Sequence, residues 1–132
     1  MSTVVVDASI AVGIASSPSG LVLIEGRDAV APGLLWPEVR SALHVSVVRK
    51  LTTRETADLA LDVLYSGVIK ERRHRDLGRV TWQIADELGW AKTYDAEYLA
   101  LARLLNSPLA TLDQRMARAA ERLGLQLDER LR

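Results

Sequence analysis

Short apolar runs alternate along this chain with longer segments of helical periodicity. The run Val4–Val6 is β-branched and ends at a polar residue, which is typical of a strand buried on both faces. The run "AVAP" predicts a second strand, which Pro32 stops, and Leu109–Leu112 predicts a third. Val68–Ile69 and the late "LQL" are weaker strand candidates. Strands separated by helices predict an α/β fold with a central parallel sheet of about four to five short strands.

The helical segments carry start and stop signals. Pro37 predicts the first residue of one helix, Thr53 predicts the N-cap of the next, and Gly67 predicts its end. Thr93 predicts the N-cap of a later helix. The expected helices are Ala8–Ala15, Pro37–Leu51, the segment between Thr53 and Gly67, Leu77–Leu88, Tyr94–Leu105 and Gln114–Leu123.

The segment after the first helix is less regular. The cluster "SSPSG" combines residues that break regular structure and is expected to close the first helix. Leu21–Ile24 fits either a strand or a short helix. With 132 residues, 48% of them apolar, the chain is expected to fold as one domain, residues 1–132, around one core.

The composition limits the cellular compartment and the kinds of reactive site that we expect for this protein. The chain has no apolar run of the length that spans a bilayer and no basic-then-apolar leader, so we expect a cytoplasmic protein without a membrane span. It has no cysteine, which excludes disulfides, thiolate nucleophiles and thiolate zinc sites. The net charge is zero, with 17 basic and 17 acidic residues, and so does not by itself indicate a nucleic-acid partner.

Four acidic residues occupy equivalent places in the predicted fold. Asp7 and Asp113 each follow an apolar strand and precede a helix, and Glu38 and Asp95 each lie in the first turn of a helix. In an open parallel sheet, such junctions lie along one edge, where these folds bind ligands. Each acid alone can be explained as a helix cap or as a partner of the helix dipole. Together they would repel one another unless cations neutralise them, which predicts a metal site.

The ligand types indicate the metal and the reaction. Carboxylates without histidine or cysteine favour Mg²⁺ or Mn²⁺ over zinc. Such ions lower the pKa of a bound water, orient it and stabilise the leaving oxygen of an in-line displacement at phosphorus. The four acids therefore predict phosphoryl chemistry, with either one or two ions.

Four sequence blocks resemble the PIN-domain toxin ribonucleases of the VapC family, over nearly the whole chain. "VVVDASI" resembles the opening strand with the first acid, Asp7, and "APGLLWPEVRSAL" the block with the second, Glu38. "TYDAEYLALA" is the most specific block and carries Asp95, and "LATLDQRMARAA" carries Asp113. The resemblance implies a PIN-like fold and a Mg²⁺- or Mn²⁺-dependent endoribonuclease that acts on RNA. It also implies a homodimer and a cognate VapB-like antitoxin whose C-terminal segment lies over the active site.

The resemblance also assigns supporting residues. Ser9 and Thr111 stand where the family has hydroxyls that support the acids, although local backbone capping explains them equally well. Ser41 stands where the family often has asparagine, and its hydroxyl can still donate a hydrogen bond to the site. Gln114 replaces a common basic residue, while Arg115 is retained.

Alternative functions for this sequence would depend on other sequence features. A catalytically silent PIN-like module that binds RNA or a protein partner is the main alternative. A receiver-like phosphoacceptor needs adjacent acids after its first strand, and Ala8 follows Asp7. A haloacid-dehalogenase-type phosphatase needs Asp-x-Asp, and Ser9 breaks that pattern. A ribonuclease using His44 and His74 lacks a recognisable catalytic context.

The remaining features are one basic segment and the aromatic residues. Lys70–Asp76 is either an RNA-backbone contact or, more simply, solvated surface. Trp82 and Tyr98 fall on apolar helix faces and are expected in the core. Trp36 and Trp90 are candidates for a subunit or antitoxin interface.

Overall fold

The computed structural model describes residues 2–130. Its strands and helices run, in chain order, from β1 to α7. They are β1 (Thr3–Val6), α1 (Ala8–Ala15), α2 (Pro18–Leu23), β2 (Asp28–Ala31), α3 (Leu35–Val48), α4 (Arg54–Tyr65), β3 (Lys70–Glu71), α5 (Leu77–Leu88), α6 (Ala96–Leu105), β4 (Leu109–Ala110) and α7 (Gln114–Arg122).

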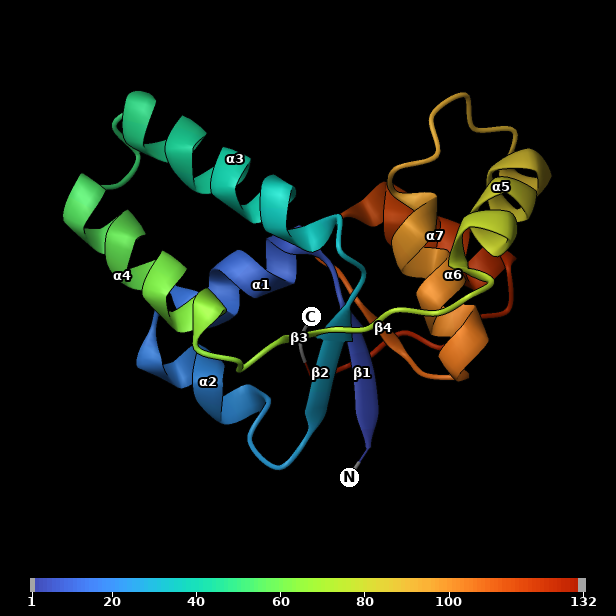
Figure 1. The fold of residues 1–132 in the computed structure, drawn as a ribbon, viewed down its shortest axis with the longest axis horizontal. Helices are drawn as coiled ribbons and strands as arrows, with labels where there is room; N and C mark the ends of the chain where they lie inside the picture. Colours follow the sequence, from blue (N-terminus) through green and yellow to red (C-terminus); the bar gives the residue numbers. More distant parts are fainter. Residues whose placement is uncertain (1, 131–132) are drawn as a thin grey trace.

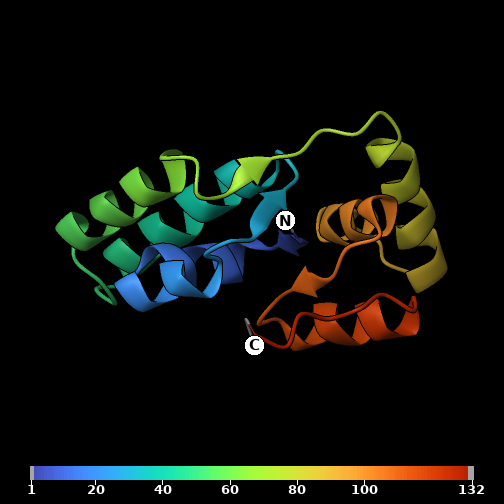
Figure 2. The same ribbon diagram turned by 90° about the horizontal axis from the view of Figure 1, so that it is seen from below.

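A parallel sheet lies at the centre of the molecule. Within residues 2–130 it has four strands in the order β3-β2-β1-β4, and every neighbouring pair is parallel. Helices α1 to α4 lie on one side of the sheet and α5 to α7 on the other, as the two views in Figures 1 and 2 agree. Because all strands run the same way, their carboxyl ends meet at one edge, near the starts of α1, α3 and α7 (Figure 1). The predicted α/β sheet is confirmed.

The middle strand β1 forms the centre of the core. Val4, Val5 and Val6 are completely buried, because β1 pairs on both sides and α6 packs against it. Burying a valine side chain contributes about 1.5–3 kcal/mol relative to leaving it exposed. A run of three such residues, terminated by a carboxylate, therefore holds Asp7 at a rigid point of the fold.

The outer strands differ from the prediction. The expected strand Val68–Ile69 is wrong by two residues, because β2 pairs with Lys70 and Glu71 instead, while Ile69 is buried just before them. The fourth strand stops at Ala110, two residues short of the expected end, and Leu112 is exposed. The "LQL" segment forms a single bridge from Leu127 to Leu109 and no strand.

Two helix starts were predicted at the wrong residue. Helix α3 begins at Leu35, whose amide donates to the carbonyl of Pro32, so that Pro37 is its third residue rather than its first. Proline is tolerated there because amides of the first turn need no helical partner. Thr93 does not cap α6, because Asp95 occupies the N-cap position. The N-cap at Thr53 is confirmed.

The cluster "SSPSG" was wrongly read as a break alone. Helix α1 does end at Ala15, but Pro18, Ser19 and Gly20 form the first half of α2. A Cβ atom at Gly20 would lie 2.6 Å from the carbonyl oxygen of Ile14 and 2.7 Å from its Cα. Only glycine therefore allows α2 to pack this closely against α1.

The C-terminal segment is tied to the start of β2 by a buried ion pair. Two guanidinium nitrogens of Arg27 donate to the carboxylate of Asp128, at 3.2 and 2.7 Å, and the two side chains are only 5% and 9% exposed. Asp128 also donates its amide to Leu109 in β4. This pair fixes the residues that follow α7 against the sheet.

Candidate metal centre

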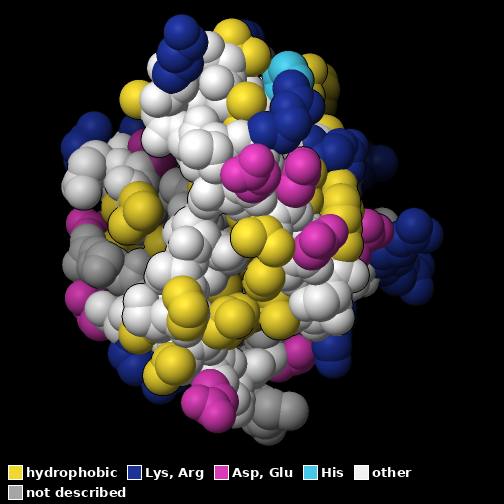
Figure 3. All heavy atoms as spheres, turned by 90° about the vertical axis from the view of Figure 1, so that its left-hand side faces the viewer, with side chains coloured by type: hydrophobic (Ala, Val, Ile, Leu, Met, Phe, Trp, Pro, Cys, Tyr) yellow, Lys and Arg dark blue, Asp and Glu magenta, His cyan; other side chains and the backbone are white. Residues whose placement is uncertain are grey.

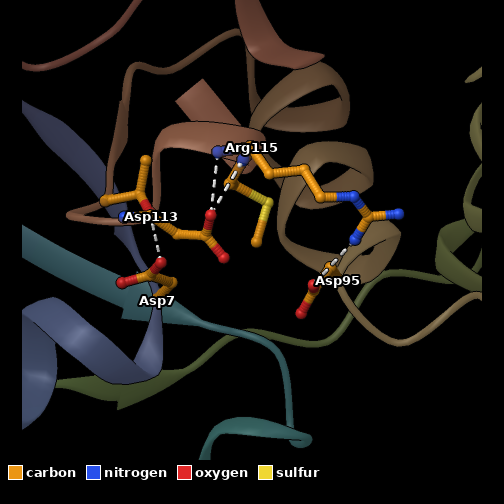
Figure 4. Close-up of polar contacts among 6 residues, drawn as sticks. Asp7, Asp95, Asp113 and Arg115 are labelled. Carbon is orange, nitrogen blue, oxygen red and sulfur yellow. Dashed lines mark hydrogen bonds and ion pairs between the residues drawn. The ribbon is translucent and has the colours of Figure 1, made fainter. Parts of the chain in front are cut away.

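The carboxyl edge of the sheet gathers the four predicted acids. Asp7 follows β1 directly and Asp113 precedes α7, while Glu38 lies in the first turn of α3 and Asp95 at the N-cap position of α6. In Figure 4 the carboxylates of Asp7, Asp113 and Asp95 surround a common region. We call Asp7, Glu38, Asp95 and Asp113 the acidic quartet.

Asp7 is the most buried member, at 4% exposed. Its Oδ1 accepts hydrogen bonds from the Ser9 hydroxyl at 2.6 Å and from the Ile10 amide at 3.1 Å, so it also caps α1. Its Oδ2 accepts a hydrogen bond from the Thr111 hydroxyl. Three donors from two segments thus fix the orientation of this carboxylate, and Ser9 and Thr111 make the contacts that were predicted for them.

Glu38 is held from the opposite helix layer. Its Oε1 accepts a hydrogen bond from the hydroxyl of Tyr98, a core residue that is 1% exposed. Helix α3 has no side-chain cap, so capping does not explain Glu38. The sequence predicted burial of Tyr98 but not this hydrogen bond. The signal was available, since a buried tyrosine hydroxyl requires a partner.

Asp95 is paired with a cation. Its Oδ2 lies 3.8 Å from Nη1 of Arg115, which reaches over from α7 (Figure 4). The guanidinium carbon of Arg115 lies 4.1 Å from the ring centroid of Trp90, which restricts its side chain by a cation–π contact. Helix α6 has no side-chain cap bond from Asp95, so capping does not explain this acid either.

Asp113 caps a helix and is also linked to Asp7 through a shared hydrogen-bond partner. Its Oδ1 accepts hydrogen bonds from the amides of Arg115 and Met116, at 2.9 and 3.3 Å, and caps α7. Its own amide donates to the Thr111 hydroxyl at 3.0 Å, so Thr111 links Asp113 to Asp7. A side-chain cap bond is therefore present for Asp7 and Asp113, whereas Glu38 and Asp95 make none.

The acids perturb one another. Burial raises the pKa of Glu38, and the carboxylates of Asp95 and Asp7 raise it further, while the Tyr98 hydrogen bond lowers it. Burial also raises the pKa of Asp95, as do the carboxylates of Asp113 and Asp7, while Arg115 lowers it. The charge of Asp95 thus interacts with those of the other three carboxylates, and Glu38 also interacts with Asp7, which makes the site favourable for a cation.

The donor set fits a hard cation that keeps part of its water shell. Within residues 2–130, no three Asp, Glu or His side chains lie close enough to surround one ion by themselves. Mg²⁺ is usually held by one or two carboxylates, with water and substrate phosphate as the other ligands. The quartet, which offers oxygen donors only, fits that kind of coordination.

Some predicted residues lie outside the quartet, and one acid was missed. Ser41 is exposed on α3 and makes no hydrogen bond to the acids within residues 2–130. Neither histidine is found in contact with them in the described part of the chain: His44 is exposed on α3, and Nδ1 of His74 accepts from the amide of Asp76. Glu97 is a fifth carboxylate at this edge, and burial and the charge of Glu38 raise its pKa. Its position two residues after Asp95 is the sequence signal that could have identified Glu97 as part of this edge.

Comparison with known proteins agrees with these observations. No protein-family model matches the chain. Ribonuclease VapC1 of Mycobacterium tuberculosis, from strain CDC 1551 / Oshkosh and from strain ATCC 25618 / H37Rv, is 34% identical to it over 125 residues. The alignment covers 90% of this chain and 92% of the relative in both cases.

Two solved structures share the fold. PAE2754 from Pyrobaculum aerophilum superposes with a TM-score of 0.71 at 23% identity, over 89% of this chain and 84% of that one. VapBC2 from Rickettsia felis, bound to a DNA fragment from their promoter, gives 0.67 at 14% identity, over 96% and 97%. The PIN-like α/β fold is confirmed, and with a 34% identical relative matched over nine-tenths of both lengths, the chain belongs to the VapC family of ribonucleases.

Proposed function

We propose that this protein is a metal-dependent endoribonuclease that acts in the cytoplasm as the toxin of a toxin–antitoxin pair. The observation that carries the proposal is the acidic quartet, four carboxylates from four separate segments at the carboxyl edge of the sheet. Membership of the VapC ribonucleases supports RNA as the substrate. The reaction is hydrolysis of a phosphodiester bond by water.

The quartet is the proposed metal site. Mg²⁺ or Mn²⁺ bound there would supply an activated water and neutralise charge on the reacting phosphate. The chain's own residues orient the ligands: Ser9 and Thr111 hold Asp7, and Tyr98 holds Glu38. Donors of this kind are expected to matter because they fix carboxylate geometry before substrate arrives.

Arg115 is the proposed phosphate contact. Its side chain is 59% exposed, and it lies between the ring of Trp90 and the carboxylate of Asp95. A guanidinium can donate two parallel hydrogen bonds to a phosphate, which lysine cannot do. The contact with Trp90 reduces the side-chain freedom that would be lost on binding. We therefore assign Arg115 to positioning the RNA backbone beside the quartet.

A VapB-like antitoxin is the proposed protein partner, and a homodimer the proposed assembly. Figure 3 views the end of the molecule formed by α2 to α4, where hydrophobic side chains lie in groups between charged ones. Val22 and Leu23 of α2 and Leu59 of α4 are 64%, 45% and 65% exposed. No helix among residues 2–130 has the length and apolar character needed to cross a bilayer. A protein partner is the cover we propose for these side chains.

The test is cleavage of a panel of structured RNAs, including tRNAs, by the purified protein. Reactions contain Mg²⁺, Mn²⁺ or EDTA, and the Asp95→Asn variant is compared with Asp62→Asn, an exposed acid of α4. We expect discrete metal-dependent cuts that Asp95→Asn reduces on the order of 100-fold or more, while Asp62→Asn cuts normally. RNA binding without cutting under any metal would support the silent PIN-like module instead. Cutting that survives EDTA or Asp95→Asn would remove the quartet as the site.

A further inference from the structure

A small cavity lies beside the acidic quartet, between α5 and the start of α6. Its volume is about 210 Å³, and it is lined by Leu77, Gly78, Thr81, Trp82, Thr93 and Glu97. This is smaller than the roughly 300 Å³ at which sites for drug-sized ligands begin. The cavity is joined to the quartet through Glu97, which follows Asp95 by two residues and lies close enough to Glu38 for their charges to interact.

One wall of the cavity contains an unsatisfied polar group. Thr81 is 5% exposed, and its hydroxyl oxygen has no hydrogen-bond partner among the described residues. Leaving a buried hydroxyl unpaired costs about 1–3 kcal/mol, so such groups are rare in folded proteins and require an explanation. A ligand that supplies the missing partner is the explanation that also accounts for the cavity.

The second feature of this cavity is an aromatic side chain that is exposed to solvent. Trp82 was expected in the core and is instead 70% exposed, so that prediction is wrong. Helix α5 packs against α6 through Thr81, Ile84 and Ala85, and the next position along the helix points away from that contact. An exposed indole beside a cavity is a stacking surface for a nucleic-acid base.

The third feature selects among bases. An ionised carboxylate accepts hydrogen bonds and cannot donate them, so Glu97 favours a base edge that carries an amino group. Cytosine, adenine and guanine have such a group, whereas uracil has none, and its one base-pairing donor, the N3 imino group, lies between two carbonyl oxygens that an ionised carboxylate repels. The hydroxyls of Thr81 and Thr93 can donate or accept and complete the edge contacts.

We propose that this cavity binds an amino-bearing RNA base of the nucleotide next to the cleaved phosphate, with the base stacked on Trp82 and its amino group donating to Glu97. The proposal rests on the proposed function, because it is the RNA substrate that brings a base to this position. It assigns Trp82 to affinity and Glu97 to base preference.

The test is binding in EDTA, where metal-dependent cleavage does not occur. Fluorescence anisotropy is measured with labelled oligocytidylate, oligoadenylate and oligouridylate of equal length. The variants are Trp82→Ala, Glu97→Gln and Thr81→Val. The matched controls are Val48→Ala, an exposed apolar residue of α3, and Glu55→Gln, which like Glu97 is the acid in the first turn of its helix. Melting curves establish that each variant is folded.

We expect the unmodified protein to bind the cytidine and adenosine oligomers more tightly than the uridine oligomer. Trp82→Ala should weaken all three by about 5- to 100-fold, the loss typical of one stacked base. Glu97→Gln should remove the preference, because a glutamine amide can also donate to uracil. Thr81→Val should weaken the preferred oligomers by roughly 5-fold. Both controls should bind normally.

Several results would overturn the subsite: a preference for uridine, unchanged binding by Trp82→Ala, or an unchanged preference in Glu97→Gln. The two proposals fail separately. Base-selective binding that depends on Trp82 and Glu97, without metal-dependent cleavage, would keep the subsite and reject the nuclease. Metal-dependent cleavage with binding and preference unaffected by both variants would keep the nuclease and reject the subsite.

Discussion

The hydroxyl of Thr111 donates a hydrogen bond to Oδ2 of Asp7, which lies 104 residues earlier in the chain. The contact exists because β1 and β4 are paired with Val6 opposite Ala110. Asp7 and Thr111, the residues that follow these two, therefore leave the sheet next to each other. The same hydroxyl accepts from the amide of Asp113. One threonine therefore positions two members of the acidic quartet.

Removal of this hydroxyl should affect activity more than folding. We expect Thr111→Val to lower RNA cleavage about 10- to 100-fold, the range typical of residues that orient metal ligands. Its free energy of unfolding should fall by about 1–3 kcal/mol, because the buried carboxylate of Asp7 loses one donor while its other two remain. Thr111→Ser, which keeps the hydroxyl, is the matched control and should retain most activity. Normal cleavage by Thr111→Val would show that Asp7 needs no such support.

The Tyr98 hydroxyl should act in the same way on Glu38. Tyr98→Phe keeps the buried ring and removes the donor whose hydrogen bond lowers the pKa of Glu38. Protonation of Glu38 then competes better with metal binding, so about tenfold more Mg²⁺ should be needed for half-maximal cleavage. The measurement is a Mg²⁺ titration of cleavage with a parallel melting curve. An unchanged Mg²⁺ midpoint would separate Tyr98 from the metal site.

Charge repulsion in the quartet should make the metal-free protein less stable at neutral pH than in mild acid. The pKa of Glu38 is raised above its ordinary value of 4.5 by burial and by the carboxylates of Asp95 and Asp7. A raised pKa means that the folded state holds the proton more tightly than the unfolded state does. The stabilisation is thus fully present below pH 4.5 and is lost as pH rises through the folded pKa.

Glu38→Gln tests this sign, because glutamine cannot become charged. In EDTA at pH 7 we expect its melting temperature to exceed that of the unmodified protein by roughly 1–3 °C. The difference should shrink at pH 5, where the carboxyl of Glu38 is partly protonated. Glu55→Gln, an exposed acid of α4, serves as the control and should show no pH-dependent gain. A larger advantage for Glu38→Gln at pH 5 than at pH 7 would contradict the argument.

The buried pair of Arg27 and Asp128 should dominate the stability of the C-terminal segment. We expect Arg27→Ala to lower the free energy of unfolding by about 3–5 kcal/mol, because it leaves Asp128 buried without its cation. The double variant Arg27→Met with Asp128→Leu should recover part of that loss. Urea denaturation measures both.

The matched control is a pair on the surface. Arg75 is 91% exposed and lies 4.0 Å from Asp76, so Arg75→Ala should cost less than about 0.5 kcal/mol. If Arg27→Ala cost no more than Arg75→Ala, burial would not be what makes the Arg27 pair important.

Local signals were sufficient where a segment is governed by its own residues. Helices α1 and α5 have the predicted bounds, and Gly89 ends α5 in the left-handed conformation with φ 70°. Predictions failed where a neighbour decides the outcome. The register with β2 moved the third strand to Lys70–Glu71. Trp82 lies in solvent because the buried face of α5 is formed by Thr81, Ile84 and Ala85.

The order of apolar runs and helical segments was enough to predict a parallel α/β sheet. The placement of two acids after strands and of two in the first turns of helices was enough to predict that all four would lie at its carboxyl edge. Those properties follow from chain direction and from burial of apolar runs, which act locally. The hydrogen bonds of Thr111 to Asp7 and of Tyr98 to Glu38, the Arg27 pair and the cavity beside Trp82 were decided by the tertiary structure. Each of these features either joins side chains from segments far apart in the chain or depends on what packs over one face of a helix. Strand register and helix packing depend on at least two segments, so the residues of one segment alone cannot predict them.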